Sequence, residues 1–111
     1  IEPARIVFAP KADIAAHLAR LSLADLVLDT LPYNAHTTAS DALWVGVPVI
    51  TCPGDTFAAR VAASLVTATG VTDTIATSLD GYEAIALRLA QDAAARRALR
   101  ERLVAARVSC P

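Results

Sequence analysis

Three short apolar segments, in which polar and apolar residues do not alternate, restrict the fold of this chain more than any other feature. They are RIVFA (residues 5–9), DLVLD (25–29) and PVITC (48–52), each rich in β-branched residues or leucine. A strand exposed on one face alternates apolar and polar residues, whereas a strand of a parallel sheet is covered on both faces. We therefore expect three short parallel strands.

Helical patterns separate and follow these segments. The expected helices cover residues 12–21, 37–46, 56–70, 79–91 and 92–107. Strands that alternate with helices predict right-handed crossovers and an α/β sheet. Crossovers of one hand place their helices on one face, so the other face needs cover from the last helices or from sequence outside this chain. We therefore expect an incomplete domain, which in isolation can pair with a copy of itself.

Composition excludes several classes of protein. The 111 residues are 55% hydrophobic and carry a net charge of −1, which gives no overall field to attract nucleic acid or an anionic membrane. No apolar run approaches the roughly 20 residues of a membrane-spanning helix, and no signal peptide is recognisable. Cys52 and Cys110 form neither a metal-ligand spacing nor a disulfide framework, so we expect a reducing, cytoplasmic location and no metal.

The last expected helix carries five arginines. They are Arg96, Arg97, Arg100, Arg102 and Arg107. Such a face near a carboxyl-terminal end typically contacts solvent and complements the helix macrodipole. Nucleic-acid binding is the less favoured alternative.

The loop TLPYNAHTT (residues 30–38) follows the second expected strand and leads into a helix that opens with Thr37 and Thr38. Ligands of open parallel sheets bind at the carboxyl ends of the strands, where loops meet helix N-termini. The unpaired N–H groups and partial positive charge there stabilise an anion, the dipole alone by roughly 0.3–1 kcal/mol, and two hydroxyls add donors. Asp41, one turn further on, can accept hydrogen bonds from a sugar hydroxyl. A phosphate beside a ribose satisfies both groups.

A purely structural interpretation competes with this one. Thr38-Ala39-Ser40-Asp41 fits a capping box, in which the threonine caps the helix and the acidic side chain reaches back. The capping box does not account for Thr37 or for the preceding His36. Capping and ligand binding can also coexist.

His17 lies on the helix that follows the first expected strand, so the start of this helix points to the same sheet edge as Thr37. Its ring can stack on a base, and the Arg20 guanidinium can donate to a base carbonyl. The favoured alternative is a partly buried core histidine, because Ile14 and Leu18 share its helical stripe.

Three further positions lie near strand-to-helix junctions. Lys11 starts a helix, where a cation opposes the dipole, which invites a functional interpretation. Asp55 or Thr56 fits an N-cap and is assigned mainly to structure. Cys52, at a strand end, is interpreted as a small buried residue.

The stretch from Ala24 to Leu65 closely resembles the carboxyl-terminal part of the catalytic region of O-GlcNAc transferases, including bacterial homologues attached to tetratricopeptide repeats. The pattern LDT-x-x-x-N-x-HTT-x-x-D-x-LW-x-G-x-P, residues 28–48, carries the resemblance. More distantly, it is similar to nucleotide-binding segments of other GT-B-type glycosyltransferases. The family implies two Rossmann-like domains with UDP-GlcNAc held mostly by the second. GlcNAc is transferred to protein Ser or Thr hydroxyls with inversion, without a catalytic metal or other cofactor.

The resemblance also implies roles for individual residues. Thr37 and Thr38 would bind the diphosphate with His36 beside it, and Asp41 would bind the ribose. His17 matches a histidine that stacks on uracil.

Two further positions match base contacts, and one position departs from the family pattern. Ala12 matches a position whose backbone reads the base, with Arg20 near it. Some relatives have a ribose-contacting lysine at the position of Ile14, and Lys11 would then take over that contact.

Residues 1–111 are therefore interpreted as the carboxyl-terminal half of a nucleotide-sugar-binding, Rossmann-like domain, excerpted from a bacterial glycosyltransferase. The excerpt would hold no catalytic residue and would be inactive alone, with acceptor proteins bound through upstream repeats. One alternative is a non-catalytic interaction domain that retains the fold. Another is a receiver-type module, although VFAP (residues 7–10) supplies no carboxylate at the end of the first expected strand.

Overall fold

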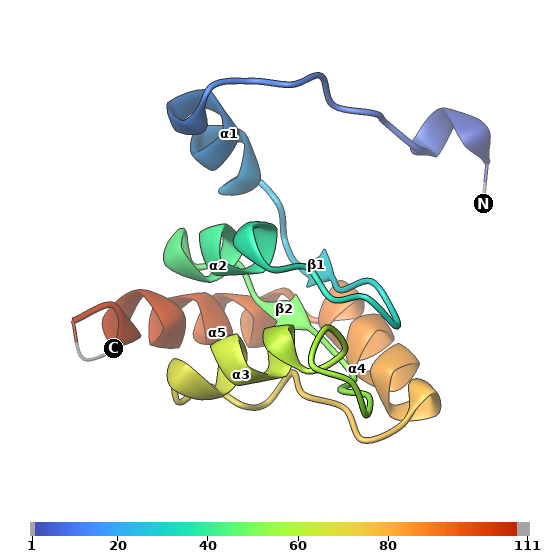
Figure 1. Cartoon of the computed structure of the whole chain (residues 1–111). Coiled ribbons are helices and arrows are strands. Elements are labelled where there is room, and N and C mark those ends of the chain that lie inside the picture. Colours follow the sequence, from blue (N-terminus) through green and yellow to red (C-terminus); the bar gives the residue numbers. More distant parts are fainter. Residues whose placement is uncertain (1, 109–111) are drawn as a thin grey trace.

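The computed structural model of the chain describes residues 2–108 and shows an α/β arrangement (Figure 1). Cys110 lies outside these residues. The described elements are the 3-10 helix η1 (Pro3–Arg5), the helices α1 (Ile14–Leu21), α2 (Thr37–Trp44), α3 (Val61–Ala68), α4 (Leu79–Gln91) and α5 (Ala93–Ala106), and the strands β1 (Val27–Leu28) and β2 (Val49–Ile50).

Two of the three expected strands are present and pair in parallel. Val27 of β1 lies opposite Val49, and Leu28 lies opposite Ile50. One further parallel bridge joins Thr51 to Ile75, so the segment before α4 continues the sheet beyond β2. Backbone pairing thus places β2 between β1 and residue 75, with α2 as the connection between the two strands.

The expectation of a strand at residues 5–9 is wrong. Arg5 ends η1, and the residues after it run as an extended segment away from the layered body (Figure 1). Val7 is 84% exposed and Phe8 91% exposed. A strand needs a neighbour to pair its backbone and a surface to cover its side chains, and among the described residues this segment has neither.

The expected helices are confirmed, with corrected boundaries. Asp13, Ser78 and Asp92 cap α1, α4 and α5, each accepting a hydrogen bond from the backbone N–H three residues on. The helix expected from residue 56 begins only at Val61, with Arg60 as its N-cap. Thr56 instead closes a turn, in which its hydroxyl accepts from the Ala59 N–H at 3.2 Å.

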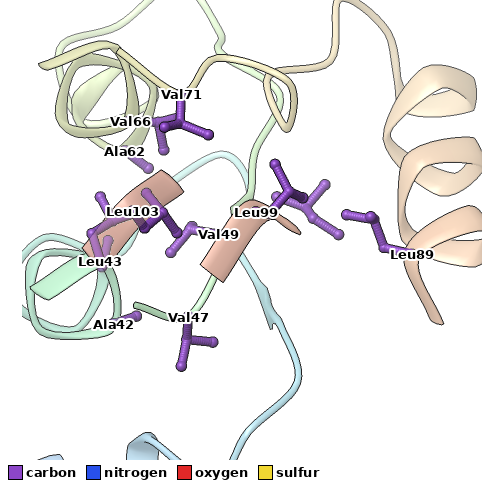
Figure 2. Packing of buried hydrophobic residues seen from close by; sticks show 12 residues of the cluster. Ala42, Leu43, Val47, Val49, Ala62, Val66, Val71, Leu89, Leu99 and Leu103 are labelled. Atoms are coloured by element: carbon purple, nitrogen blue, oxygen red, sulfur yellow. The ribbon is translucent and has the colours of Figure 1, made fainter. Parts of the chain in front are cut away.

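The buried core lies where β2 meets four helices. Figure 2 shows side chains of α2, α3, α4 and α5 directed toward the β2 region. The fully buried residues include Val49 and Ile50, which form β2 and direct their side chains to its opposite faces, and Val47 just before it. A strand enclosed on both faces explains why its sequence does not alternate.

Gly46 ends α2, as the sequence predicts. Its φ of +88° is a left-handed conformation that glycine adopts without penalty. An added Cβ would also lie 2.9 Å from Cγ2 of Val104 on α5, so glycine permits the close approach of the two helices.

The arginines of α5 are more than a solvated face, which corrects the expectation from the sequence. Arg100 donates to the carbonyls of Ser22 (3.1 Å) and Ala24 (3.0 Å), just beyond the end of α1. Arg96 donates to the carbonyls of Leu89 and Ala90 at the end of α4. These side chains therefore satisfy the open carbonyl ends of other helices and attach those helices to α5.

The three remaining described contacts of this arginine face involve side chains, the first being the Arg96–Asp25 pair, whose Nε and Oδ1 atoms lie 3.8 Å apart. Arg102 pairs with Asp73 at 2.9 Å, and the Arg107 guanidinium lies 5.2 Å from the ring centroid of Trp44.

None of the helices within residues 2–108 combines the length and apolar character needed to cross a bilayer.

Candidate functional site

The loop between β1 and α2 is built on a buried carboxylate. Asp29 ends the first paired strand and is 5% exposed. Its Oδ1 accepts from the Ala35 N–H at 2.8 Å, and its Oδ2 accepts from the Thr51 hydroxyl at 2.7 Å. The Tyr82 hydroxyl of α4 donates to the Asp29 carbonyl at 2.8 Å. The carboxylate thus links the end of the loop to the strand segment that follows β2.

Asn34, which is fully buried, holds the same loop from the other side. Its N–H donates to the Ala58 carbonyl at 2.8 Å, and its side-chain amide donates to the Thr30 carbonyl at 3.1 Å. Its Oδ1 accepts from the Ala62 N–H in the first turn of α3 at 3.3 Å. Asn34 therefore fastens the loop to itself and to α3.

Sequence reasoning assigned no role to Asp29, Asn34 or Thr51. The available signal was weak: a polar residue at the end of an apolar strand, followed by an asparagine in a loop. Burial also raises the pKa of the Tyr82 phenol, and the nearby Asp29 carboxylate adds to this rise.

The capping box expected at Thr38 and Asp41 is not formed. The helix begins at Thr37, and its N-cap is His36, whose side chain makes no cap hydrogen bond. Thr37 and Thr38 occupy the first turn and are exposed. Within residues 2–108, the N–H groups of Thr37, Thr38 and Ala39 have no hydrogen-bond partner, so α2 presents open donors at its N-terminus.

His36 stands directly beside this helix start. Its ring stacks on that of Tyr33, with centroids 5.1 Å apart and planes 6° apart. Its Nε2 is buried and has no hydrogen-bond partner among the described residues. A buried polar atom without a partner is rare, because it costs on the order of 1–3 kcal/mol.

Asp41 pairs with His17 instead of capping its helix. The His17 Nε2 lies 3.5 Å from Oδ2 of Asp41, which joins α1 to α2 across their packed faces. The two side chains are 29% and 22% exposed, so solvent reaches both. His17 is thus partly buried, as its helical stripe predicted, and it also lies at the site.

The remaining candidates lie in or just before α1. Arg20 donates to the Pro10 carbonyl at 2.9 Å and so holds the segment that contains Ala12. In the described structure the Ala12 backbone makes no hydrogen bond. Lys11 is exposed and precedes the helix, so it does not oppose the α1 dipole as expected.

A shallow pocket of about 180 Å³ lies elsewhere. It is lined by residues of α2, α3 and α5, among them Trp44, Leu65 and Leu103. It opens at the carboxyl-terminal end of α2 and includes none of the candidate residues.

Cys52 is half-buried and has a free thiol. In residues 2–108, no three His, Cys, Asp or Glu side chains are grouped so as to hold a metal ion.

The fold and the site define an α/β unit with a parallel sheet, in which an open helix N-terminus, a carboxylate and an imidazole lie beyond the carboxyl end of a strand. The model of glycosyl transferase family 41 matches residues 1–111, and the chain belongs to this family. This membership leaves the receiver-type alternative without support.

Named relatives agree with the family. The chain is 44% identical over 112 residues to a probable UDP-N-acetylglucosamine–peptide N-acetylglucosaminyltransferase, SEC, of Arabidopsis thaliana, covering 100% of this chain and 12% of that protein. It is also 44% identical, over 93 residues, to the UDP-N-acetylglucosamine–peptide N-acetylglucosaminyltransferase of Caenorhabditis elegans, with 84% of this chain and 8% of that protein covered.

A solved structure shares the fold. A mutant of the O-GlcNAc transferase of Thermobaculum terrenum superposes with a TM-score of 0.82 at 37% identity, over 91% of this chain and 19% of that chain. The α/β arrangement expected from the sequence is therefore that of an O-GlcNAc transferase. The chain spans less than a fifth of each of these three proteins.

Proposed function

We propose that this chain is the carboxyl-terminal half of the nucleotide-sugar-binding domain of a GT-B-type protein O-GlcNAc transferase, and that it binds the UDP part of UDP-GlcNAc. The open N-terminus of α2, with two exposed threonines, carries the proposal. The names of the relatives supply the donor and the reaction type.

The chemistry of the α2 start suits a diphosphate. Three unpaired N–H groups and two hydroxyls can donate to phosphate oxygens, and the helix dipole favours negative charge. The buried Nε2 of His36 lies beside the same helix start and has no hydrogen-bond partner among the described residues. A polar ligand atom that paired with it would remove the free-energy cost of leaving it unpaired. An anion therefore meets donors there without any charged side chain.

The spacing of the other candidates suits a nucleoside. His17 and Asp41, proposed to stack on the base and to bind the ribose, lie 3.5 Å apart, as residues that contact neighbouring parts of one ligand must. The free Ala12 backbone and Arg20 would complete the base side, with Lys11 near the ribose. Nucleoside binding then exchanges the His17–Asp41 contact for contacts with the ligand.

These groups would contribute to catalysis by holding and stabilising the leaving group. Negative charge develops on UDP as the bond to the sugar breaks, and donors already aimed at it lower the barrier. Positioning of the donor sugar adds to this effect. The acid or base that acts on the acceptor hydroxyl would come from residues outside this chain, which would therefore be inactive alone.

The partners and the location are also part of the proposal. Acceptor proteins would be bound through tetratricopeptide repeats elsewhere in a cytoplasmic, bacterial enzyme. The isolated chain would self-associate, which is supported by large exposed apolar side chains such as Val7, Phe8 and Leu23.

Isothermal titration of the full-length protein with UDP tests the function. A Thr37→Val/Thr38→Val double variant should bind UDP at least tenfold more weakly, because both hydroxyl donors are lost. Ser64→Ala, at an exposed position of α3, is the control and should bind normally. Undiminished UDP affinity in a folded double variant would refute the proposed site. No UDP binding by the folded wild type would favour a non-catalytic interaction domain.

A further inference from the structure

We infer that Asp29, Thr51 and Asn34 are positioning residues that fix the N-terminus of α2 for diphosphate binding. They would act through the loop of residues 30–36 and touch no ligand themselves. The inference rests on the proposed function, because it concerns how well that site holds UDP.

The Asp29 carboxylate joins the loop to the sheet. One oxygen accepts from the Ala35 N–H, two residues before α2 begins, and the other accepts from the Thr51 hydroxyl. Thr51 is itself fixed, because its N–H donates to Thr74 and its carbonyl accepts from Ala76. The position of Ala35 is therefore fixed relative to the strand segment after β2, through Asp29.

Asn34 supplies the second attachment. Its side chain joins the Thr30 carbonyl to the Ala62 N–H of α3, and its own N–H donates to Ala58. The loop is thereby held at two consecutive residues, 34 and 35, immediately before His36. Asp29 and Asn34 are themselves buried, and their bonds with Thr51 and Ala62 are shielded from water that would weaken them.

Apolar packing holds the loop less firmly than these contacts, because it comes from the small side chain of Ala35, which lies against the core. Leu31 is 39% exposed and Tyr33 is 65% exposed. The body of α2, in contrast, is anchored by the buried Ala39, Ala42 and Leu43. Weakening the polar attachments should therefore displace the loop and the first turn of α2 while leaving the rest of the helix packed.

Thr51→Val removes one attachment with little change in shape. Valine has the same branching and is favoured in strands, but it cannot donate to Asp29. Thr69→Val is the matched control: the Thr69 hydroxyl makes two part-buried hydrogen bonds at the carboxyl-terminal end of α3, away from the loop. Thr51→Ser restores the donor and should rescue the variant.

The readout is the ratio of the dissociation constants of UDP and uridine, measured by calorimetry on the full-length protein. Thr51→Val should weaken UDP about tenfold and uridine less than twofold, because the diphosphate contacts the first turn of α2, whereas Asp41, which would bind the ribose, lies in the part of the helix that is anchored by Ala39, Ala42 and Leu43. Thr51→Ser and Thr69→Val should keep the wild-type ratio. A purely structural role would weaken both ligands equally or reduce only the folded fraction, so it would leave the ratio unchanged.

Three outcomes overturn the inference. An unchanged ratio in folded Thr51→Val refutes it while the proposed function stands, provided that the wild type binds UDP. An equal loss in Thr69→Val shows that the effect is general destabilisation. A wild type that binds no UDP refutes the proposed function and this inference together.

A second variant covers the case in which Thr51→Val does not fold. Asp29→Asn keeps an acceptor for the Ala35 N–H, and the Thr51 hydroxyl can turn to accept from the new amide. This variant should fold and lower the UDP-to-uridine discrimination by about two- to threefold, because neutral hydrogen bonds are weaker than those to a carboxylate. An unchanged ratio here would also overturn the inference.

Discussion

Arg100 is expected to control the attachment of α1, and with it the position of His17. Its guanidinium is half-buried and donates to the carbonyls of Ser22 and Ala24. None of the residues of α1 is buried, so this helix has few other anchors: it packs on α2, and His17 contacts Asp41. Loss of the two hydrogen bonds should therefore release α1 before it affects the core.

The size of the effect follows from the geometry. A hydrogen bond to a charged group contributes about 1.5–3 kcal/mol, but both bonds are donated by one nitrogen, Nη2, and are partly exposed, so we assign them a joint value well below twice that of one bond. Arg100→Met, which keeps most of the apolar stem, should cost about 2 kcal/mol for the two bonds together. That free energy corresponds to roughly thirtyfold more frequent local opening of α1.

Hydrogen exchange followed by mass spectrometry measures this opening directly. In Arg100→Met, amides of α1 should exchange roughly thirtyfold faster, while those of α3 should be unchanged. Arg97→Met, an exposed position on the same helix, is the control. The reasoning would be refuted by unchanged exchange in α1, or by an equal acceleration in α1 and α3.

Two further predictions concern stability. Gly46→Ala forces a positive φ and a 2.9 Å contact with Val104, so it should lower the free energy of unfolding by about 1–3 kcal/mol in thermal melts. A Val104→Ala background should recover the part due to the contact, and no recovery would contradict that cause. Arg102 holds the pKa of Asp73 below its ordinary value, so their pair stabilises the fold above that value. This stability is lost as the pH falls through the lower pKa of the folded state, so urea titrations of wild type and Arg102→Gln should differ at pH 7 and converge as acidification protonates Asp73.

Local sequence patterns predicted the helices and two strands well. The apolar stripes repeat within a turn or two of chain, so their physics is local, whereas the caps that the sequence suggested at Thr38 and at Asp55 or Thr56 are not formed. Residues 5–9 have the same strand-like composition as residues 25–29, yet they have no pairing partner in the described structure. Composition reports what a segment prefers, whereas pairing depends on the rest of the fold.

The sequence named the exposed residues of the candidate site but not the buried residues that support them. Thr37, Thr38 and Asp41 could be placed together because they share one helix start. The support depends on contacts distant in sequence: Asp29 meets Thr51 across 22 positions, and Asn34 meets Ala62 across 28. No local pattern encodes such pairs.

Local and long-range contacts also compete for the Asp41 side chain, which could either cap its own helix or face α1. A capping box would have kept the carboxylate on its own helix, close to the N–H groups that a phosphate needs. The structure instead directs it toward His17 on α1, which leaves those groups open. The nucleoside and the diphosphate of the proposed ligand could then both be bound, without repulsion between the Asp41 carboxylate and the diphosphate.

This arrangement also divides the site into a firmly held half and a loosely held half. The α2 start is attached through hydrogen bonds of the buried Asp29 and Asn34, whereas α1 has no buried residue and meets the core only through the partly buried Leu21 among its described residues. On the proposed function, UDP touches both halves, so its binding energy would add to the packing of α1 on α2 and replace the His17–Asp41 contact. Saturating UDP should therefore slow hydrogen exchange in α1 more than in α2, because α1 opens locally more often in the absence of ligand.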